Sequence, residues 1–315
     1  MKLAVLSTPR RMESLAFWKN PILVKEIRTR MRGNRAFVLL TAHLLILGLA
    51  MLLVFLVFRS SFGSGANLEA RGSFGKAVFG LLVWMELVMI SFTAPALTSG
   101  AISLERERQT FDLLKVTLLK ARSLALGKYL SGLVFIFLLL VTSLPLFSLA
   151  FILGGVVLEE IVIAVLILAT SAITFCAIGL FFSSLFARSL VSTVLSYAFA
   201  IFSNFGIPLL MLFGITLFGL LINSRPGSPM DVPTFWTLVL VYFGWLVISL
   251  TPLATIVATE VALLDGQGAW VAHLPLGSNT EVFFISPWVV YVLFYLLLSL
   301  ALIWISIKLV ARAER

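Results

Sequence analysis

The sequence predicts an all-α integral membrane protein with six transmembrane helices, because its composition is too apolar for a soluble domain. The chain has 315 residues, of which 61% are hydrophobic and 12% are charged. Its mean hydropathy is +1.11. Soluble domains contain roughly 45–50% apolar and about 25% charged residues, so a soluble globule could not cover this much apolar surface. A disordered chain needs the opposite balance and is excluded for the same reason.

Six apolar stretches are long enough to cross a bilayer, which takes about 20 helical residues. The first contains His43, the second contains the single acid Glu86, and the third and fourth contain no titratable acid, base or His. The fifth contains Asn204 and Pro208, and the proline predicts a kink. The predicted spans form one transmembrane domain, residues 36–310, and comprise residues 36–58, 77–100, 129–153, 161–186, 190–222 and 286–310.

One further apolar stretch, residues 234–264, is interrupted by Thr251-Pro252. A plain seventh span is one interpretation, and it would place the two ends of the chain on opposite sides of the membrane. A re-entrant hairpin on the outer face is the interpretation we favour. Such a hairpin is tolerated in a membrane only where its backbone is buried in protein or lines a cavity.

The distribution of basic residues supports the hairpin. Nineteen of the 23 Lys and Arg residues fall in residues 1–35, residues 101–128, the turn at Arg188 and the C-terminal end including residues 311–315. The connections that alternate with these regions hold four basic and six acidic residues. Cytoplasmic loops are enriched in Lys and Arg, so both termini are predicted to be cytoplasmic. The net charge of +9 therefore reflects topology, and no nucleic-acid partner is expected.

A basic amphipathic helix is predicted in the N-terminal segment, residues 1–35. Asn20-Pro21 is typical of a helix start. Beyond it, apolar residues recur every four positions and basic residues fall on another face: Leu23, Ile27 and Met31 against Lys25, Arg28 and Arg32. Such a helix is suited to the inner membrane interface. A basic cluster that only sets the topology is the alternative.

A second amphipathic helix is predicted in the polar loop of residues 101–128. One apolar stripe runs along it, and a charged run follows its first member: Leu104, Phe111, Leu114 and Leu118, with Glu105, Arg106, Glu107 and Arg108. A charged run on a helix is commonly a solvated face. Together with the stripe, it also suits a docking surface for a soluble partner, which is our hypothesis.

These two segments resemble parts of the type-2 exporter family of ATP-binding-cassette permeases. The first is similar to the N-terminal connecting helix of that family and reads Asn20-Pro-Ile-Leu-Val-Lys-Glu26-Ile-Arg28-Thr-Arg30-Met-Arg32. The second is similar to the loop between the second and third spans and reads Leu104-Glu105-Arg106-Glu107-Arg-Gln-Thr110-Phe-Asp112-Leu113-Leu114, with Leu126-Gly127-Lys128 further on. The chain departs from the family pattern at Gln109 and Leu118, where glycine and proline are usual.

The resemblance implies a permease that carries no ATPase of its own. Such a permease lies in the lipid bilayer of a bacterial or archaeal plasma membrane, pairs with a second permease, and is driven by separate ATP-binding subunits. Those subunits bind the ATP and dock on cytoplasmic coupling helices, so this chain is expected to hold no cofactor. By position, the resemblance assigns coupling to eight residues: Glu26, Arg30, Glu105, Arg106, Glu107, Thr110, Leu113 and Leu114.

The sequence offers no motif for catalysis or metal binding. It contains no Gly-x-x-x-x-Gly-Lys-Ser/Thr phosphate loop, no His-Glu-x-x-His and no Gly-x-Ser-x-Gly. The two histidines, His43 and His273, are predicted at different depths, so a shared metal site is not expected. An intramembrane enzyme is therefore disfavoured, because it needs a catalytic constellation.

Three residues inside the predicted spans are candidates for a transport pathway. An intramembrane carboxylate such as Glu86 is costly and marks either a polar pathway or a buried structural pair. Asn204 with Pro208 suits a polar kink beside a pathway, and ordinary helix packing is the alternative. A secondary transporter or channel not driven by ATP is the alternative function. That class predicts more intramembrane charge and an inverted repeat.

Overall fold

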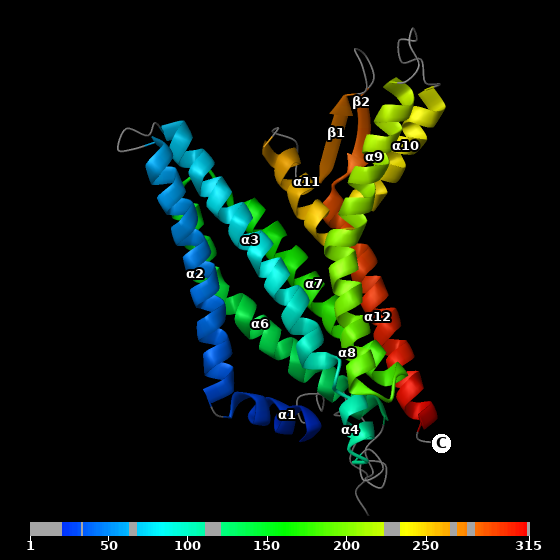
Figure 1. Cartoon of the computed structure of the whole chain (residues 1–315). Helices are drawn as coiled ribbons and strands as arrows, with labels where there is room; N and C mark the ends of the chain where they lie inside the picture. Colours follow the sequence, from blue (N-terminus) through cyan, green and yellow to red (C-terminus); the bar gives the residue numbers. More distant parts are fainter. Residues whose placement is uncertain are drawn as a thin grey trace, which may run out of the picture.

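The computed structural model describes residues 21–32, 34–62, 68–110, 121–223, 234–264, 270–275 and 281–313. These residues form a bundle of long helices with one small sheet (Figure 1). The predicted helical class is confirmed, since the structure is about 90% helical. Six helical stretches within the described residues are long and apolar enough to cross a membrane, as the sequence predicts, and a bent pair of helices would add a seventh if the pair forms one span.

The six candidate spans extend close to the predicted stretches. Four are the single helices α2 (Asn34–Phe62), α6 (Ala121–Leu153), α7 (Leu158–Leu185) and α12 (Pro287–Ala313), and a fifth runs from Gly72 in α3 (Leu68–Thr98) to Glu107. The remaining span joins α8 (Ser189–Ile201), the π-helix η3 (Phe202–Gly206) and α9 (Ile207–Asn223). Helix α3 begins before the predicted span start at residue 77, and α6 begins before the one at residue 129, because the helical backbone continues through charged residues at the ends of the apolar stretches.

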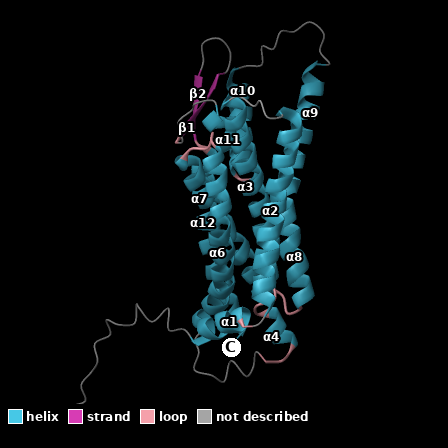
Figure 2. Ribbon diagram, turned by 90° about the vertical axis from the view of Figure 1, so that its left-hand side faces the viewer, coloured by secondary structure: helices cyan, strands magenta, loops and turns pink. Residues whose placement is uncertain are grey.

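One end of the bundle carries two short helices, and we call it the α1 end. Helix α1 (Pro21–Met31) lies across this end, where α4 (Ser103–Glu107) and the last turn of α12 are also found (Figures 1 and 2). Helix α1 buries Ile22 and Leu23 against the bundle, whereas Met31, the last residue of the predicted apolar stripe, is 46% exposed. The backbone amides of Ile102 and Ser103 donate to Ser183 Oγ at 2.8 and 3.0 Å, which fixes the start of α4 against α7.

Helices α10 (Thr234–Ser249) and α11 (Pro252–Leu264) lie towards the opposite end, which we call the α11 end (Figure 1). They meet inside the bundle, at the buried Thr251-Pro252, with a bend of 113° (Figure 1). Figure 1 shows both helices in the half of the bundle away from α1. A two-stranded antiparallel sheet lies beside them, formed by β1 (Val271–Pro275) and β2 (Glu281–Ile285) with Val271 opposite Ile285. The sequence did not predict these two strands.

Helix α7 lies at the centre of the bundle and packs against α3, α6, α8 and α12. Close packing needs small residues, and a Cβ at Gly179 of α7 would collide with the Thr98 side chain of α3. Helix α2 lies at the periphery, and its apolar side chains Phe37, Leu53 and Val57 are exposed. An apolar outer face of this kind suits a helix that contacts lipid.

Candidate functional site

The charged residues of α1 and α4 meet at the α1 end, where Lys128 of α6 joins them. Lys128 Nζ lies 2.6 Å from Glu105 Oε1 and 3.6 Å from Glu26 Oε1. Arg30 Nε lies 3.9 Å from Glu26 Oε2, and Arg30 Nη2 donates to the Leu97 carbonyl of α3 at 2.8 Å. We call Glu26, Arg30, Glu105 and Lys128 the Lys128 network. It connects α1, α3, α4 and α6.

Burial makes Lys128 the central member of this network. Its side chain is 7% exposed, whereas Glu26 and Glu105 are 28% and 24% exposed. A buried ammonium is tolerated only when it is paired and hydrogen-bonded. Two carboxylates and two cations balance the charge of the cluster. Lys128 ends the Leu126-Gly127-Lys128 motif but is not among the predicted coupling residues. Its position between Glu26 and Glu105 is seen only in the structure.

A cavity of about 390 Å³ opens beside the Lys128 network, between α1, the end of α3, α4 and α6. All four residues of the network line it, together with Leu104, Arg108 and Thr110. Leu104 is 39% exposed, and Arg108 and Thr110 are also exposed. The site therefore combines a fixed charged floor with an apolar and basic rim. This combination suits the side chains of a protein partner.

Two of the predicted coupling residues face away from this cavity. Arg106 Nη1 donates to the Ser184 carbonyl at 3.0 Å, at the end of α7. Glu107 Oε1 accepts the Ser189 backbone amide at 2.9 Å, and Glu107 Oε2 accepts the Ser189 hydroxyl at 2.5 Å. Glu107 therefore caps the first turn of α8. Of the others, Glu26, Arg30, Glu105 and Thr110 line the cavity, and Leu113 and Leu114 lie outside the described residues.

The capping role of Glu107 predicts a pH-dependent contribution to stability. Its hydrogen bonds with Ser189 hold the pKa of the carboxyl below its usual 4.5. The stabilisation is therefore fully present above pH 4.5 and is lost as the pH falls through the lower folded-state pKa. We expect Glu107→Gln to lower the thermal unfolding midpoint at neutral pH and to lose this effect in acid. Glu159→Gln, at an exposed residue of α7, is the control. If Glu107→Gln lowers the thermal unfolding midpoint by the same amount at neutral and at acidic pH, the ionised Glu107 carboxylate does not cap α8.

Gln109 stands in a backbone conformation that favours glycine. Its φ is +58°, in the left-handed region, and its amide donates to the Arg106 carbonyl at 3.1 Å. A side chain in this region costs roughly 1–2 kcal/mol, which gives a physical reason for glycine at this position. We expect Gln109→Gly to raise the free energy of unfolding by about 1 kcal/mol. Arg108→Gly is the matched control, since Arg108 has a φ of −81° and glycine there should destabilise the turn.

The candidate pathway residues do not share one cavity. Glu86 of α3 is fully buried, and its Oε2 lies 3.1 Å from Nε2 of His43 in α2, a partner that sequence reasoning missed. Asn204 lies in η3, where its Nδ2 donates to Ser91 Oγ at 3.0 Å. Asn204 and Pro208 line a different cavity of about 510 Å³, beside α11, to which Glu86 does not contribute. The helix is irregular close to the position of the predicted kink, where the π-helical turn η3 ends two residues before Pro208.

No metal centre is present among the described residues, since no three His, Cys, Asp or Glu side chains lie close enough to hold an ion. No family model matches the chain, and no curated protein shows a significant match to it. The function must therefore be inferred from the residues and from the geometry of the α1 end.

Proposed function

We propose that the chain is the membrane-spanning permease subunit of an ATP-driven exporter of the ATP-binding-cassette type. One observation carries the proposal: two short helices, α1 and α4, meet at one end of an apolar bundle and frame a cavity with a charged floor. The exposed rim, with Leu104 and Arg108, is the surface on which a separate ATP-binding subunit docks. That subunit binds and hydrolyses the ATP.

The contacts of α4 support a mechanism of force transmission. The helix is joined to α6 through Glu105 and Lys128, and its first residues are held by Ser183 of α7. Glu107 joins its end to Ser189 of α8. A partner that moves α4 would therefore move three candidate spans together. If the bundle follows this movement, the transport pathway would change from being open on one side of the membrane to being open on the other.

Charge and helix geometry support the arrangement that we propose in the membrane. The α1 end carries the basic segments and is cytoplasmic in this proposal, and the membrane is the plasma membrane of a bacterium or archaeon. Helices α10 and α11 then form a re-entrant hairpin on the outer face, since they bend by 113° and both lie at the α11 end. A second permease, of the same or a different sequence, completes the transport pathway.

A reporter fused after residue 315 tests the six-span arrangement. We expect a C-terminal alkaline phosphatase fusion to be inactive and a C-terminal green fluorescent protein fusion to be bright, because the first folds only outside the cytoplasm. The same reporters fused after Phe62, the end of α2, are the internal control and should give the reverse pattern. External activity at the C-terminus would contradict the hairpin and favour a seventh span.

Copurification tests the proposed function directly. The full chain, expressed from its native locus with an affinity tag and extracted in mild detergent, should retain an ATP-binding subunit in stoichiometric amount. Arg108→Glu should reduce this amount at least about tenfold, because it reverses the charge of the exposed rim. Arg312→Glu, at an exposed residue of the last turn of α12, is the control and should have no effect. Purification of the folded chain without any ATPase would overturn the proposal.

The buried pair of His43 and Glu86 favours one alternative, a secondary transporter driven by an ion gradient. Titratable side chains inside a membrane commonly belong to a proton or ion pathway. In that case, substrate movement in vesicles would depend on the gradient alone and would need neither ATP nor a second subunit. The same pair also suits a structural link between α2 and α3, which is the role that the exporter proposal assigns to it.

A further inference from the structure

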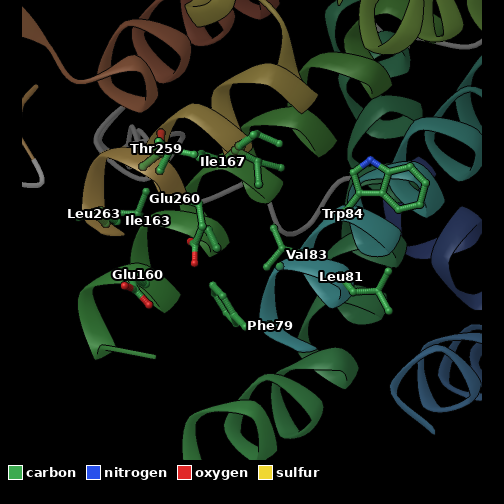
Figure 3. Close-up of a pocket in the computed structure, with 15 residues that line it drawn as sticks. Phe79, Leu81, Val83, Trp84, Glu160, Ile163, Ile167, Thr259, Glu260 and Leu263 are labelled. Atoms are coloured by element: carbon green, nitrogen blue, oxygen red, sulfur yellow. The ribbon is translucent and has the colours of Figure 1, made fainter. Parts of the chain in front are cut away.

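A cavity of about 370 Å³ lies near the α11 end, between α3, α7 and α11. Figure 3 shows the residues that line it. Its walls are largely apolar and include Phe79 and Val83 of α3, Ile163 and Ile167 of α7, and Ile256 and Leu263 of α11. The volume lies in the range of small-molecule sites, roughly 300–1,000 Å³. The cavity shares no residue with the site at the α1 end.

Three polar side chains enter this apolar cavity, and two of them carry buried atoms without a partner. Glu160 is satisfied: its Oε1 lies 3.3 Å from Lys76 Nζ, and its Oε2 accepts the Val157 amide at 3.1 Å. Glu260 Oε1 and Thr259 Oγ1 are buried and make no hydrogen bond with any described residue. The Thr259 residue is only 3% exposed. Buried polar atoms of this kind call for a ligand or water.

The charges at the cavity define what that ligand carries. Lys76 pairs with Glu160 and is also close enough to act on Glu260, so a single cation serves two carboxyl groups and the cavity has room for a second cation when both are ionised. In Figure 3 the Glu260 carboxylate points towards the part of the cavity formed by Glu160 and Phe79. A carboxylate only accepts hydrogen bonds, and a hydroxyl can accept them, whereas a protonated amine donates up to three. An amine placed beside the Glu260 carboxylate would satisfy its unpartnered oxygen.

The rim of the cavity indicates how such a ligand enters. Val257 and Val261 of α11 line it and are 56% and 50% exposed, and Trp84 of α3 lines it and is 37% exposed. Exposed apolar side chains on the flank of a membrane bundle face lipid chains. A ligand with an alkyl chain could therefore enter from the bilayer with its polar group leading. The apolar walls offer no ligand atoms for a metal ion.

We propose that the cavity between α3, α7 and α11 binds the protonated amine headgroup of an amphiphile, with the Glu260 carboxylate as its hydrogen-bond acceptor. The alkyl chain lies along the apolar walls and leaves past Trp84. This binding does not require an ATP-binding partner. If the chain is an exporter permease, the ligand of this site is either a transported amphiphile or a lipid bound to the permease. Binding is measured on the isolated chain, so a negative result would not bear on the exporter proposal.

The experiment uses the full chain in a maltoside detergent and two bromine-labelled probes of equal length, bromoundecylamine and bromoundecanol. Bromine quenches the fluorescence of a nearby tryptophan. The part of the quenching that is lost in the Trp84→Phe variant therefore measures binding in this cavity. We expect saturable quenching by the amine and at least about tenfold weaker binding of the alcohol, as for a hydrogen bond to a charged group. Glu260→Gln should raise the Kd of the amine at least about tenfold. Glu159→Gln removes an exposed carboxylate next to Glu160 and should leave this Kd unchanged.

Three results would overturn the proposal: equal affinity for amine and alcohol, an unchanged Kd in a folded Glu260→Gln variant, or full quenching in Trp84→Phe. Circular dichroism verifies that each variant is folded. Nanodiscs then separate the two sources of such a headgroup. If phosphatidylethanolamine in a phosphatidylglycerol bilayer weakens binding of the amine probe, the natural occupant is a membrane lipid. If it does not, the site is selective for a single-chain amine, and the proposal stands in that form.

Discussion

Replacing Lys128 by alanine is expected to lower the free energy of unfolding by about 3 kcal/mol or more, since removing one partner of a buried ion pair leaves the other charge uncompensated. Two carboxylates, Glu105 and Glu26, would then face each other without their shared cation. Reversible unfolding in mixed micelles measures the change. Arg122→Ala removes an exposed cation from the same helix and is the control, expected to change stability by less than about 0.5 kcal/mol.

A second variant separates charge from packing at this position. Lys128→Met keeps most of the volume of the side chain, and combining it with Glu105→Gln removes both charges of the shortest pair. We expect the double variant to be more stable than Lys128→Met alone, because a buried pair removed as a whole costs less than a broken one. In the proposed complex, both Lys128 variants should also reduce the ATP-binding subunit that copurifies. Stability like that of the wild type in Lys128→Ala would show that the network is not a structural link.

Breaking the pair of His43 and Glu86 has the second largest expected effect. His43→Leu leaves the fully buried Glu86 without its partner, and Glu86→Leu does the same to His43. Each single variant should lower the free energy of unfolding by about 2 kcal/mol or more, because the buried group that remains loses the partner that lies 3.1 Å away. The double variant should regain most of this loss, because neither polar group remains and two leucines suit the surroundings.

The double variant also decides between the two candidate functions. If the pair is a structural link, the doubly substituted chain should fold, bind the ATP-binding subunit and support its ATPase activity. If the pair belongs to an ion pathway, the same variant should fold but lose all transport that an ion gradient drives. A double variant that is less stable than either single variant would contradict the pairing of His43 with Glu86.

The spans could be predicted from the sequence because a bilayer imposes a simple length and polarity requirement on each helix. The ends of the helices could not, since charged residues such as Lys76 and Arg122 continue the helix beyond the apolar stretch. The short strands β1 and β2 were missed because the backbone pairing of five-residue segments depends on the neighbours they contact. Trp245 of α10 donates to the Ile285 carbonyl of β2 at 3.0 Å, for example.

Polar contacts between distant residues were the hardest part of the site to predict. The position of Lys128 between Glu26 and Glu105 depends on how α1 crosses the end of α6, which local patterns do not encode. The sequence did contain a signal for the pairing of His43 with Glu86, since they are the only titratable side chains well inside the first two spans. His43 lies nine residues after Asn34, the start of α2, and Glu86 lies twelve residues before Thr98, the end of α3, and these two helix ends lie at the same end of the bundle. Neighbouring antiparallel helices bring such positions to similar depths.

The most direct test of the central claim is cross-linking from position 108. The buried Cys176 is the only cysteine, so Arg108→Cys combined with Cys176→Ala gives a single reactive thiol on the exposed rim. A photoreactive label on this thiol, activated in native membranes, should attach to a protein that mass spectrometry identifies as an ATP-binding subunit, and the thiol should react only in inside-out vesicles. Labelling from the outer side, or no attachment to an ATP-binding subunit in membranes that contain one, would contradict the assignment of the α1 end as the docking site.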